Sequence, residues 1–335
     1  MNYRVIKLPN SSVVFTWITD IHLSAVAPGR RSDAYRSQIF RKLDFVRELT
    51  EKVNGVCLCG GDIFHIKGSH SKANSLNMIN ETIRMFGSYP TGKIYSAAGN
   101  HDIQFDRMDT ILSQPLGVLI EAGVCHLLNH EPVIFTNEDE SVKVSVETFD
   151  YAGGVETMAA LLNSGDRHPD VDYRLGIVHA SGVPGDSRER FGEWTVGYNQ
   201  LKDIDFDLLL WGHDHTRTET ATVGNVTHIN LGSLARAALS SDETERKIVT
   251  SILTFTAEKA RIKEVEVPCL PIAQAFRTED KVIEKSKDNS EVRKFFSDMN
   301  ESVDEIISDD PIVVIESLCK DEPILASLIK ELCEY

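Results

Sequence analysis

The sequence has no long hydrophobic run. Nowhere do about 20 apolar residues follow one another, as a membrane-spanning helix requires. The first residues, Met1-Asn-Tyr-Arg-Val-Ile6, also lack the apolar core of about 7–15 residues that a signal peptide carries. We therefore expect a protein that has no membrane partner and works in the cytoplasm.

Basic residues are also scarce, with 35 Lys and Arg against 51 Asp and Glu and a formal net charge of −16. A protein that coats nucleic acid without regard to sequence needs a broad basic face, so the composition argues against that class. No stretch combines aromatic and basic residues as single-strand-binding proteins do. Nucleic acid stays open as a substrate, because bound divalent metals can reverse the electric field in one cleft.

The six cysteines do not form a metal-binding pattern. Cys57 and Cys59 alternate within one strand-like run, and no second pair of thiols lies at the spacing of a zinc site. We expect buried or free thiols rather than metal ligands.

Strand-like and helical patterns alternate along the chain. Apolar runs at residues 13–19, 56–59 and 93–98 alternate with helical patterns at 33–53 and 76–86, which predicts parallel strands covered by helices. Further runs predict hairpins between 124 and 149, strands at 173–178 and 206–211, and hairpins at 219–230 and 247–267. The predicted fold class is α/β, with a two-sheet sandwich flanked by helices.

Two domains follow from this pattern. Residues 1–267 are predicted to form the catalytic domain, and residues 268–335 a linker and a small, acidic helical segment. The apolar faces of these last helices either pack onto the catalytic domain or form a short cap or a docking surface for a partner.

Side chains that could bind a metal follow five of the strand-like runs. They occur in Asp20-Ile-His22, Gly61-Asp62, Gly99-Asn-His-Asp102, Val178-His179 and Gly212-His-Asp-His215. In α/β sheets, ligands bind at the carboxyl ends of parallel strands, so these clusters should meet. We predict a dinuclear site made by seven residues: Asp20, His22, Asp62, Asn100, His179, His213 and His215.

This donor set indicates the chemistry. Two ions about 3.5–4 Å apart lower the pKa of a bridging water and clamp the oxygens of a phosphate. Imidazole and oxygen donors favour manganese, zinc or iron.

The five motifs, in this order, resemble the signature of the calcineurin-like metallophosphoesterases over residues 13–235. The resemblance implies that Asp20, His22, Asp62 and His215 hold one ion, and that Asp62 bridges to a second ion held with Asn100, His179 and His213. It also implies a metal-activated hydroxide as nucleophile, with His101 protonating the leaving oxygen and Asp102 orienting the imidazole of His101. Mn²⁺ is the favoured metal, with Zn²⁺, Fe²⁺ and Mg²⁺ as alternatives.

Within this superfamily, Gly61-Asp-Ile-Phe-His65 and Gly232-Ser-Leu-Ala-Arg236 resemble the SbcD-type nucleases of double-strand-break repair. That resemblance implies a DNA exonuclease or endonuclease of recombination and repair, with His65 contacting substrate phosphate. It also implies a coiled-coil ATPase partner of the SbcC type and admits a homodimer. Arg30 and Arg31 follow the first motif and are further candidates to contact phosphate.

Two other functions remain open. A phosphatase or phosphodiesterase acting on a small molecule, a cyclic nucleotide or a phosphoprotein would use the same ions, and the acidic composition suits such a substrate. A metal-binding scaffold that docks through its acidic helices is disfavoured, because a scaffold has no need of a proton donor such as His101.

Overall fold

The computed structural model describes residues 4–68, 71–128, 132–151, 155–162, 170–190, 193–238 and 246–276. The chain divides into two units, Met1–Thr278 and Glu279–Tyr335. All the described residues belong to the first unit. The acidic helices predicted near the carboxyl terminus therefore lie outside the described residues.

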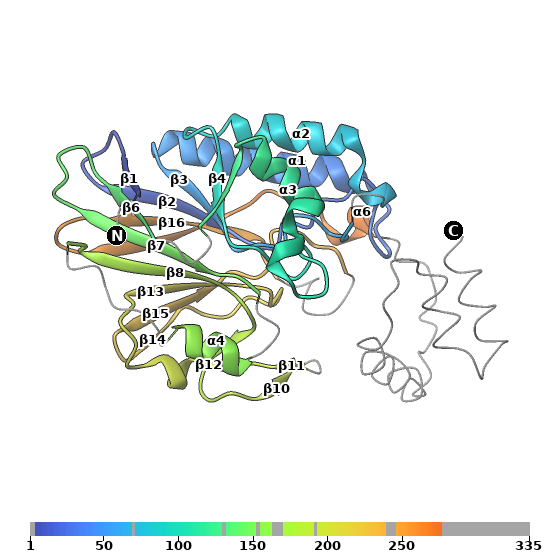
Figure 1. Cartoon of the computed structure of the whole chain (residues 1–335). Coiled ribbons are helices and arrows are strands. Elements are labelled where there is room, and N and C mark those ends of the chain that lie inside the picture. The colour runs from blue at the N-terminus through green and yellow to red at the C-terminus, as the bar shows by residue number, and fades with distance from the viewer. Residues whose placement is uncertain are drawn as a thin grey trace. The chain divides into compact units, whose positions relative to one another are not determined.

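Two mixed sheets form the centre of the first unit (Figure 1). The six-stranded sheet has the order β17 (Ala260–Glu266), β16 (Val249–Phe255), β2 (Val13–Ile18), β3 (Val56–Cys59), β4 (Ile94–Ser96), β5 (Cys125–Leu127). The seven-stranded sheet has the order β1 (Arg4–Lys7), β6 (Val133–Thr136), β7 (Lys143–Phe149), β8 (Tyr173–His179), β13 (Leu208–Gly212), β15 (Val226–Asn230), β14 (Ala221–Val223). Strands β2 to β5 run parallel in the first sheet, and β7, β8, β13 and β15 run parallel in the second.

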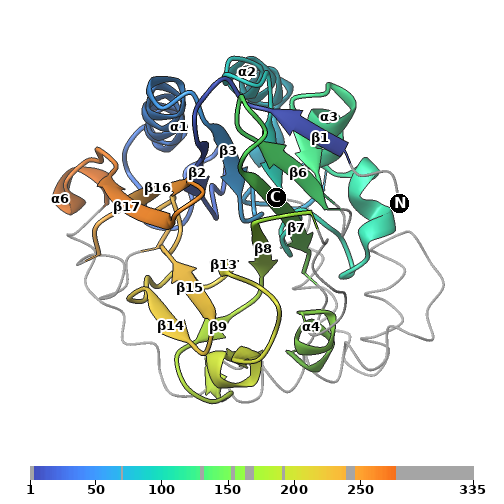
Figure 2. The same ribbon diagram turned by 90° about the vertical axis from the view of Figure 1, so that its left-hand side faces the viewer.

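Helices cover the outer faces of the two sheets, as Figure 2 shows in the end-on view. Helices α1 (Tyr35–Lys52), α2 (Leu76–Gly87) and α3 (Pro115–Glu121) lie on the six-stranded sheet, and α4 (Val155–Leu162) lies on the seven-stranded sheet. The shorter elements are η1 (Lys72–Asn74), η2 (Met108–Ser113), β9 (Gly182–Val183), β10 (Glu189–Arg190), β11 (Glu193–Trp194), β12 (Val196–Gly197), η3 (Tyr198–Leu201) and α6 (Ile272–Ala275).

Hydrophobic burial explains this layering. The core between the sheets is aromatic at its centre, where the rings of Phe15 and Phe135 pack edge to face at 5.1 Å between centroids. Helix α1 buries Ile39, Leu43 and Val46, which recur at the spacing of one helical face, against the six-stranded sheet. In the described residues, no helix combines the length and apolar composition needed to cross a bilayer.

The predicted α/β sandwich is confirmed, including the antiparallel pairs β6–β7 and β14–β15. Two features were not predicted. Helices η2 and α3 follow the third metal-competent cluster, and four short strands in two pairs lie between β8 and β13. Both segments are short and interrupted, so they lack the sustained periodicity on which sequence-based prediction depends.

Candidate metal centre

The structure brings the predicted donors together in two overlapping groups. Asp20, His22, Asp62 and His215 form one group, and Asp62, His179 and His213 form the other, with the ligand atoms of each group within 4.8 Å of one another. Asn100 joins the second group, because its Oδ1 lies 3.2 Å from Nε2 of His179 and 3.0 Å from Nδ1 of His213. Asp62 belongs to both groups, which is the position of a bridging carboxylate.

Each donor stands at or just beyond the carboxyl end of a strand. Asp20 and His22 follow β2, Asp62 follows β3 and Asn100 follows β4, all in the six-stranded sheet. From the seven-stranded sheet, His179 ends β8, and His213 and His215 follow β13. The centre therefore lies where the ends of the two sheets meet.

Four of the donors stand in left-handed backbone conformations, in the turns that follow their strands. Asp20, His22, Asp62 and His213 have φ angles of 52°, 48°, 50° and 84°. Positive φ is uncommon outside glycine and costs about 1–2 kcal/mol per residue. On an extended strand, residues i and i+2 share a face but stay about 6.6 Å apart. In these turns the ligand atoms of Asp20 and His22 lie within 4.8 Å of each other. Such strain persists only where the surrounding fold enforces it, and it gathers at functional sites.

Glycine is required beside these donors because the backbone segments touch. A Cβ atom at Gly99 would lie 2.1 Å from Oδ1 of Asp62 and 2.5 Å from Cε1 of His179. Gly61 has φ +97°, and a Cβ there would lie 2.7 Å from the backbone nitrogen of Gly99. The glycines of the second and third motifs therefore permit the close approach of Asp62 and Asn100.

Hydrogen bonds from neighbouring groups orient the donors as a metal site requires. The ring of His179 donates from Nδ1 to the carbonyl oxygen of Gly60 at 2.6 Å, which leaves Nε2 as the metal-binding nitrogen. Asp20 accepts from the Thr19 hydroxyl at 2.6 Å, and Asp62 accepts from the backbone N–H of His101 at 2.8 Å. Nε2 of His22 and Nε2 of His215 lie 2.8 Å apart, close enough to bind one ion. The residues fit a pair of divalent cations.

Burial sets the charge state of the centre. It lowers the pKa of His179 to about 3, and together with the nearby His215 it lowers the pKa of His22 well below the usual 6.5. These imidazoles are therefore neutral at physiological pH, which is the form that binds metals. Burial also raises the pKa of Asp62. A carboxylate in such a position gains most from a bound cation, which compensates the buried negative charge.

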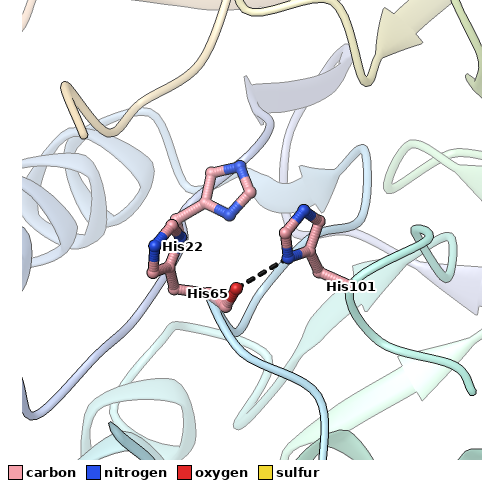
Figure 3. A group of neighbouring side chains, drawn as sticks. All are labelled: His22, His65 and His101. Carbon is pink, nitrogen blue, oxygen red and sulfur yellow. Dashed lines mark hydrogen bonds between the residues drawn. The ribbon is translucent and has the colours of Figure 1, made fainter. Parts of the chain in front are cut away.

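His101 sits beside these donors and is held by the backbone of His65. Its Nδ1 donates to the His65 carbonyl oxygen at 2.6 Å (Figure 3). Its ring stacks on the ring of His65 at 5.9 Å with an interplanar angle of 10°, and it meets His22 edge to face at 5.0 Å. The three histidines also form a group with ligand atoms within 4.8 Å.

Asp102 has different partners from those expected. Its carboxylate accepts hydrogen bonds from the backbone N–H groups of Gly99, Ile63 and Phe64, at 3.0 Å, 3.1 Å and 3.4 Å. The carbonyl oxygen of His65, rather than Asp102, orients the imidazole of His101. Burial, followed by the negative charge of Asp62, raises the pKa of Asp102 to about 8. Asp102 therefore fastens the loop of His101 to the loop of Asp62.

The two arginines proposed from the first motif differ in position. Arg30 is exposed. Arg31 is buried, and its guanidinium donates to both carboxylate oxygens of Asp33 at 2.8 Å and 2.5 Å. The guanidinium carbon also lies 4.9 Å from the ring centroid of Tyr35 and 4.9 Å from that of Phe276. The expectation that Arg31 contacts substrate phosphate is therefore corrected: its guanidinium is engaged inside the fold.

Tyr151 is a neighbour of the centre that the sequence did not identify. Its ring lies 5.5 Å from that of His213 and 6.2 Å from that of His179. Tyr151 comes two residues after the end of β7, and its neighbour Asp150 accepts from the backbone N–H of Ala98 at 2.6 Å. The donors were predicted because they are polar residues directly after strands, and Asp150 and Tyr151 follow β7 in the same way.

Two layers of helices around two sheets, with carboxylates and neutral imidazoles gathered at the strand ends, define a metal-dependent hydrolase. The family model of the calcineurin-like phosphoesterases matches residues 13–217. The chain belongs to this family and is a metal-dependent phosphoester hydrolase.

One solved structure similar to this chain is that of a conserved uncharacterized protein, a predicted phosphoesterase, from Streptococcus pneumoniae TIGR4. It shares 12% sequence identity with a TM-score of 0.32, over 78% of this chain and 94% of that chain. No curated protein matches the sequence.

Proposed function

We propose that this phosphoesterase is a DNA nuclease of the SbcD type, which cleaves phosphodiester bonds in recombination and repair. The observation that carries the proposal is the position of His65, three residues after the shared Asp62. Its ring stacks on that of His101, and its Nδ1 is buried with no hydrogen-bond partner in the described residues. A buried, unpartnered nitrogen beside the expected proton donor suits a contact with a phosphate oxygen.

In this proposal, different residues of the centre bind the metal ions and donate the proton. Two divalent ions, with Mn²⁺ favoured, would supply an activated water and neutralise the charge of the phosphate. Asp20, His22 and His215 would hold one ion and Asn100, His179 and His213 the other, with Asp62 shared. His101 gives a proton to the leaving oxygen from Nε2, because its Nδ1–H is engaged by the carbonyl oxygen of His65.

The proposal includes a partner. By resemblance to SbcD-type nucleases, a coiled-coil ATPase binds residues 268–335, and the chain pairs with a second copy. Co-purification with such an ATPase, compared between the full chain and a chain ending at residue 278, tests the first point. Equal recovery of both chains with the ATPase contradicts it.

Incubation of the purified chain with linear duplex and single-stranded DNA in Mn²⁺ tests the activity. We expect shortening or nicking that chelation abolishes, and no cleavage by Asp62→Asn or His101→Asn. If DNA stays intact in Mn²⁺, Mg²⁺ and Zn²⁺, with and without the ATPase, the nuclease proposal fails. Turnover of cyclic nucleotides or monoesters in the same preparation then identifies a small-molecule phosphoesterase, which the net charge of −16 favours.

A further inference from the structure

Two exposed aromatic side chains lie on chain segments connected to the metal centre and have no role in the hydrolysis described above. Phe105 is 72% exposed and Trp194 is 64% exposed. Phe105 lies on the segment after β4 that carries Asn100 and His101, and Trp194 lies between β8 and β13, the strands that carry the imidazole donors. Each of the two segments begins at the end of a donor-bearing strand and carries one large exposed aromatic side chain.

Phe105 is held in a strained turn. The backbone N–H of Arg107 donates to the carbonyl oxygen of Gln104 at 3.1 Å, and the two central residues, Phe105 and Asp106, have φ angles of 54° and 52°. Positive φ at both central positions is the pattern of a type I′ turn, which favours asparagine and glycine. A phenylalanine there is an outlier that needs a reason.

Hydrogen bonds to the hydroxyl of Thr110 also hold this turn in place. Thr110 Oγ1 accepts from the backbone N–H of Gln104 at 2.9 Å and donates to the carbonyl oxygen of Arg107 at 2.6 Å. Phe105 lies four positions after His101 in the sequence, a reach of at most about 14 Å. The fold thus holds a strained, exposed ring at most about 14 Å along the chain from the expected proton donor.

Trp194 stands on a hairpin tied to the other side of the centre. Strand β11 pairs with β10, with Trp194 opposite Glu189. Arg190 of β10 forms an ion pair with Asp214, which lies between His213 and His215. After Trp194 the chain enters β12, which pairs with β9 directly after the His179 segment. The hairpin is therefore fastened to both imidazole-bearing loops, and Arg188 next to it is exposed.

We propose that Phe105 and Trp194 stack on unpaired bases on the two sides of the scissile phosphate, so that the substrate is a single-stranded or frayed polynucleotide. This inference rests on the proposed nuclease function and specifies its substrate class. Stacking of a base on an aromatic side chain is worth about 1–3 kcal/mol, and a nearby arginine suits the backbone. Single exposed apolar residues are common on protein surfaces. A strained turn next to His101 and a hairpin tied to Asp214, each carrying an exposed ring, are a more specific arrangement.

Tryptophan fluorescence measures the stacking without any turnover. The chain has three tryptophans, and Trp17 and Trp211 are fully buried, so quenching by an added strand reports on Trp194. An oligothymidylate titrated into the His101→Asn variant in Mg²⁺ should quench the emission saturably. Phe105→Asn in that background should raise the Kd about 5- to 150-fold, the equivalent of about 1–3 kcal/mol. Absence of quenching overturns the inference.

Matched variants test the same point in turnover. Asparagine tolerates positive φ, so Phe105→Asn removes the ring and relieves the strained turn. Phe105→Asn and Trp194→Ala should each lower the ratio of kcat/KM for a single strand over that for a small chromogenic diester, about 5- to 150-fold. Trp194→Phe should restore most of the ratio. Leu112→Asn, which removes another exposed apolar side chain (62%), is the control and should leave the ratio unchanged.

The outcomes separate this inference from the nuclease proposal. Cleavage of DNA with unchanged ratios and no quenching overturns the inference alone. Quenching without cleavage in any metal overturns the nuclease proposal and supports the base contacts. A change of sedimentation in Phe105→Asn or Trp194→Ala with unchanged ratios assigns the rings to a protein contact and overturns the inference.

Discussion

The two sheets contribute different chemistry to the metal centre. The six-stranded sheet supplies every oxygen donor, through Asp20, Asp62 and Asn100, together with His22. The seven-stranded sheet supplies imidazoles only, through His179, His213 and His215. The negative charge that would hold two cations therefore comes from one side, and the other side would complete the coordination with imidazoles.

The two sides also differ in burial and strain. Asp20, His22 and Asp62 are buried and all have positive φ, whereas the side chain of His215 is 39% exposed. On the imidazole side, only His213 shows positive φ. The oxygen side thus carries most of the backbone strain, and the imidazole side includes a partly exposed donor. We expect substitutions on the oxygen side to have the larger effect.

The largest effect is expected for Asp62→Asn, which removes the carboxylate common to both donor groups. The variant should bind at most one ion and lose at least about 1,000-fold in kcat/KM, about 4 kcal/mol of transition-state stabilisation. Elemental analysis of the dialysed protein and hydrolysis of a chromogenic diester measure the two quantities. Retention of two ions with ordinary turnover would show that Asp62 does not bridge.

His101→Asn separates proton donation from metal binding. We expect kcat to fall about 100- to 10,000-fold while the metal content stays that of the unaltered protein, because His101 is a proton donor rather than a ligand. The loss should be smaller for a nitrophenolate leaving group, which needs little protonation, than for a nucleoside. An equal loss for both leaving groups would assign His101 a different role.

Gly99→Ala tests the close contact between the second and third motifs. Its Cβ would overlap Oδ1 of Asp62 at 2.1 Å, so we expect a loss of about 1–3 kcal/mol in unfolding free energy and weaker metal binding. Gly87→Ala is the matched control, because the nearest atom to its Cβ would be Cγ1 of Val124 at an ordinary 3.4 Å. Urea unfolding of both variants decides the point, and equal stabilities would contradict the crowding.

The smallest effect concerns His228, buried in the seven-stranded sheet, where burial lowers the pKa to about 4. The unfolded chain binds a proton at about pH 6.5, so the folded state loses stability as the pH falls from 6.5 toward 4. Between pH 7 and 5.5 the loss is about 1 kcal/mol. His228→Gln should remove this share of the pH dependence in urea unfolding with chelator present, while the buried His22 and His179 retain theirs. An unchanged slope would show that His228 does not titrate there.

Much of the fold could be predicted because the longer strands and helices have a local pattern of apolar residues that identifies them. The apolar runs that became β2, β3 and β8 each end at a donor, and Ile39, Leu43 and Val46 mark one helical face. The segments that escaped prediction, η2, α3 and the short pairs around β10, are too short to carry a period. The position of Phe105 also escaped, because exposure depends on what the rest of the chain leaves uncovered.

The sequence by itself determined which side chains stand at the ends of strands. Each strand stops where its run of apolar residues stops, so the residues that follow the run occupy the strand end. It therefore identified Asp20, Asp62 and His179 as donors that could meet. Only the tertiary structure decided the partners of those side chains. Arg31 contacts Asp33 and two aromatic rings, and Asp102 accepts hydrogen bonds from three backbone N–H groups. A buried polar group takes the partner that packing brings to it, and packing joins residues far apart in the chain.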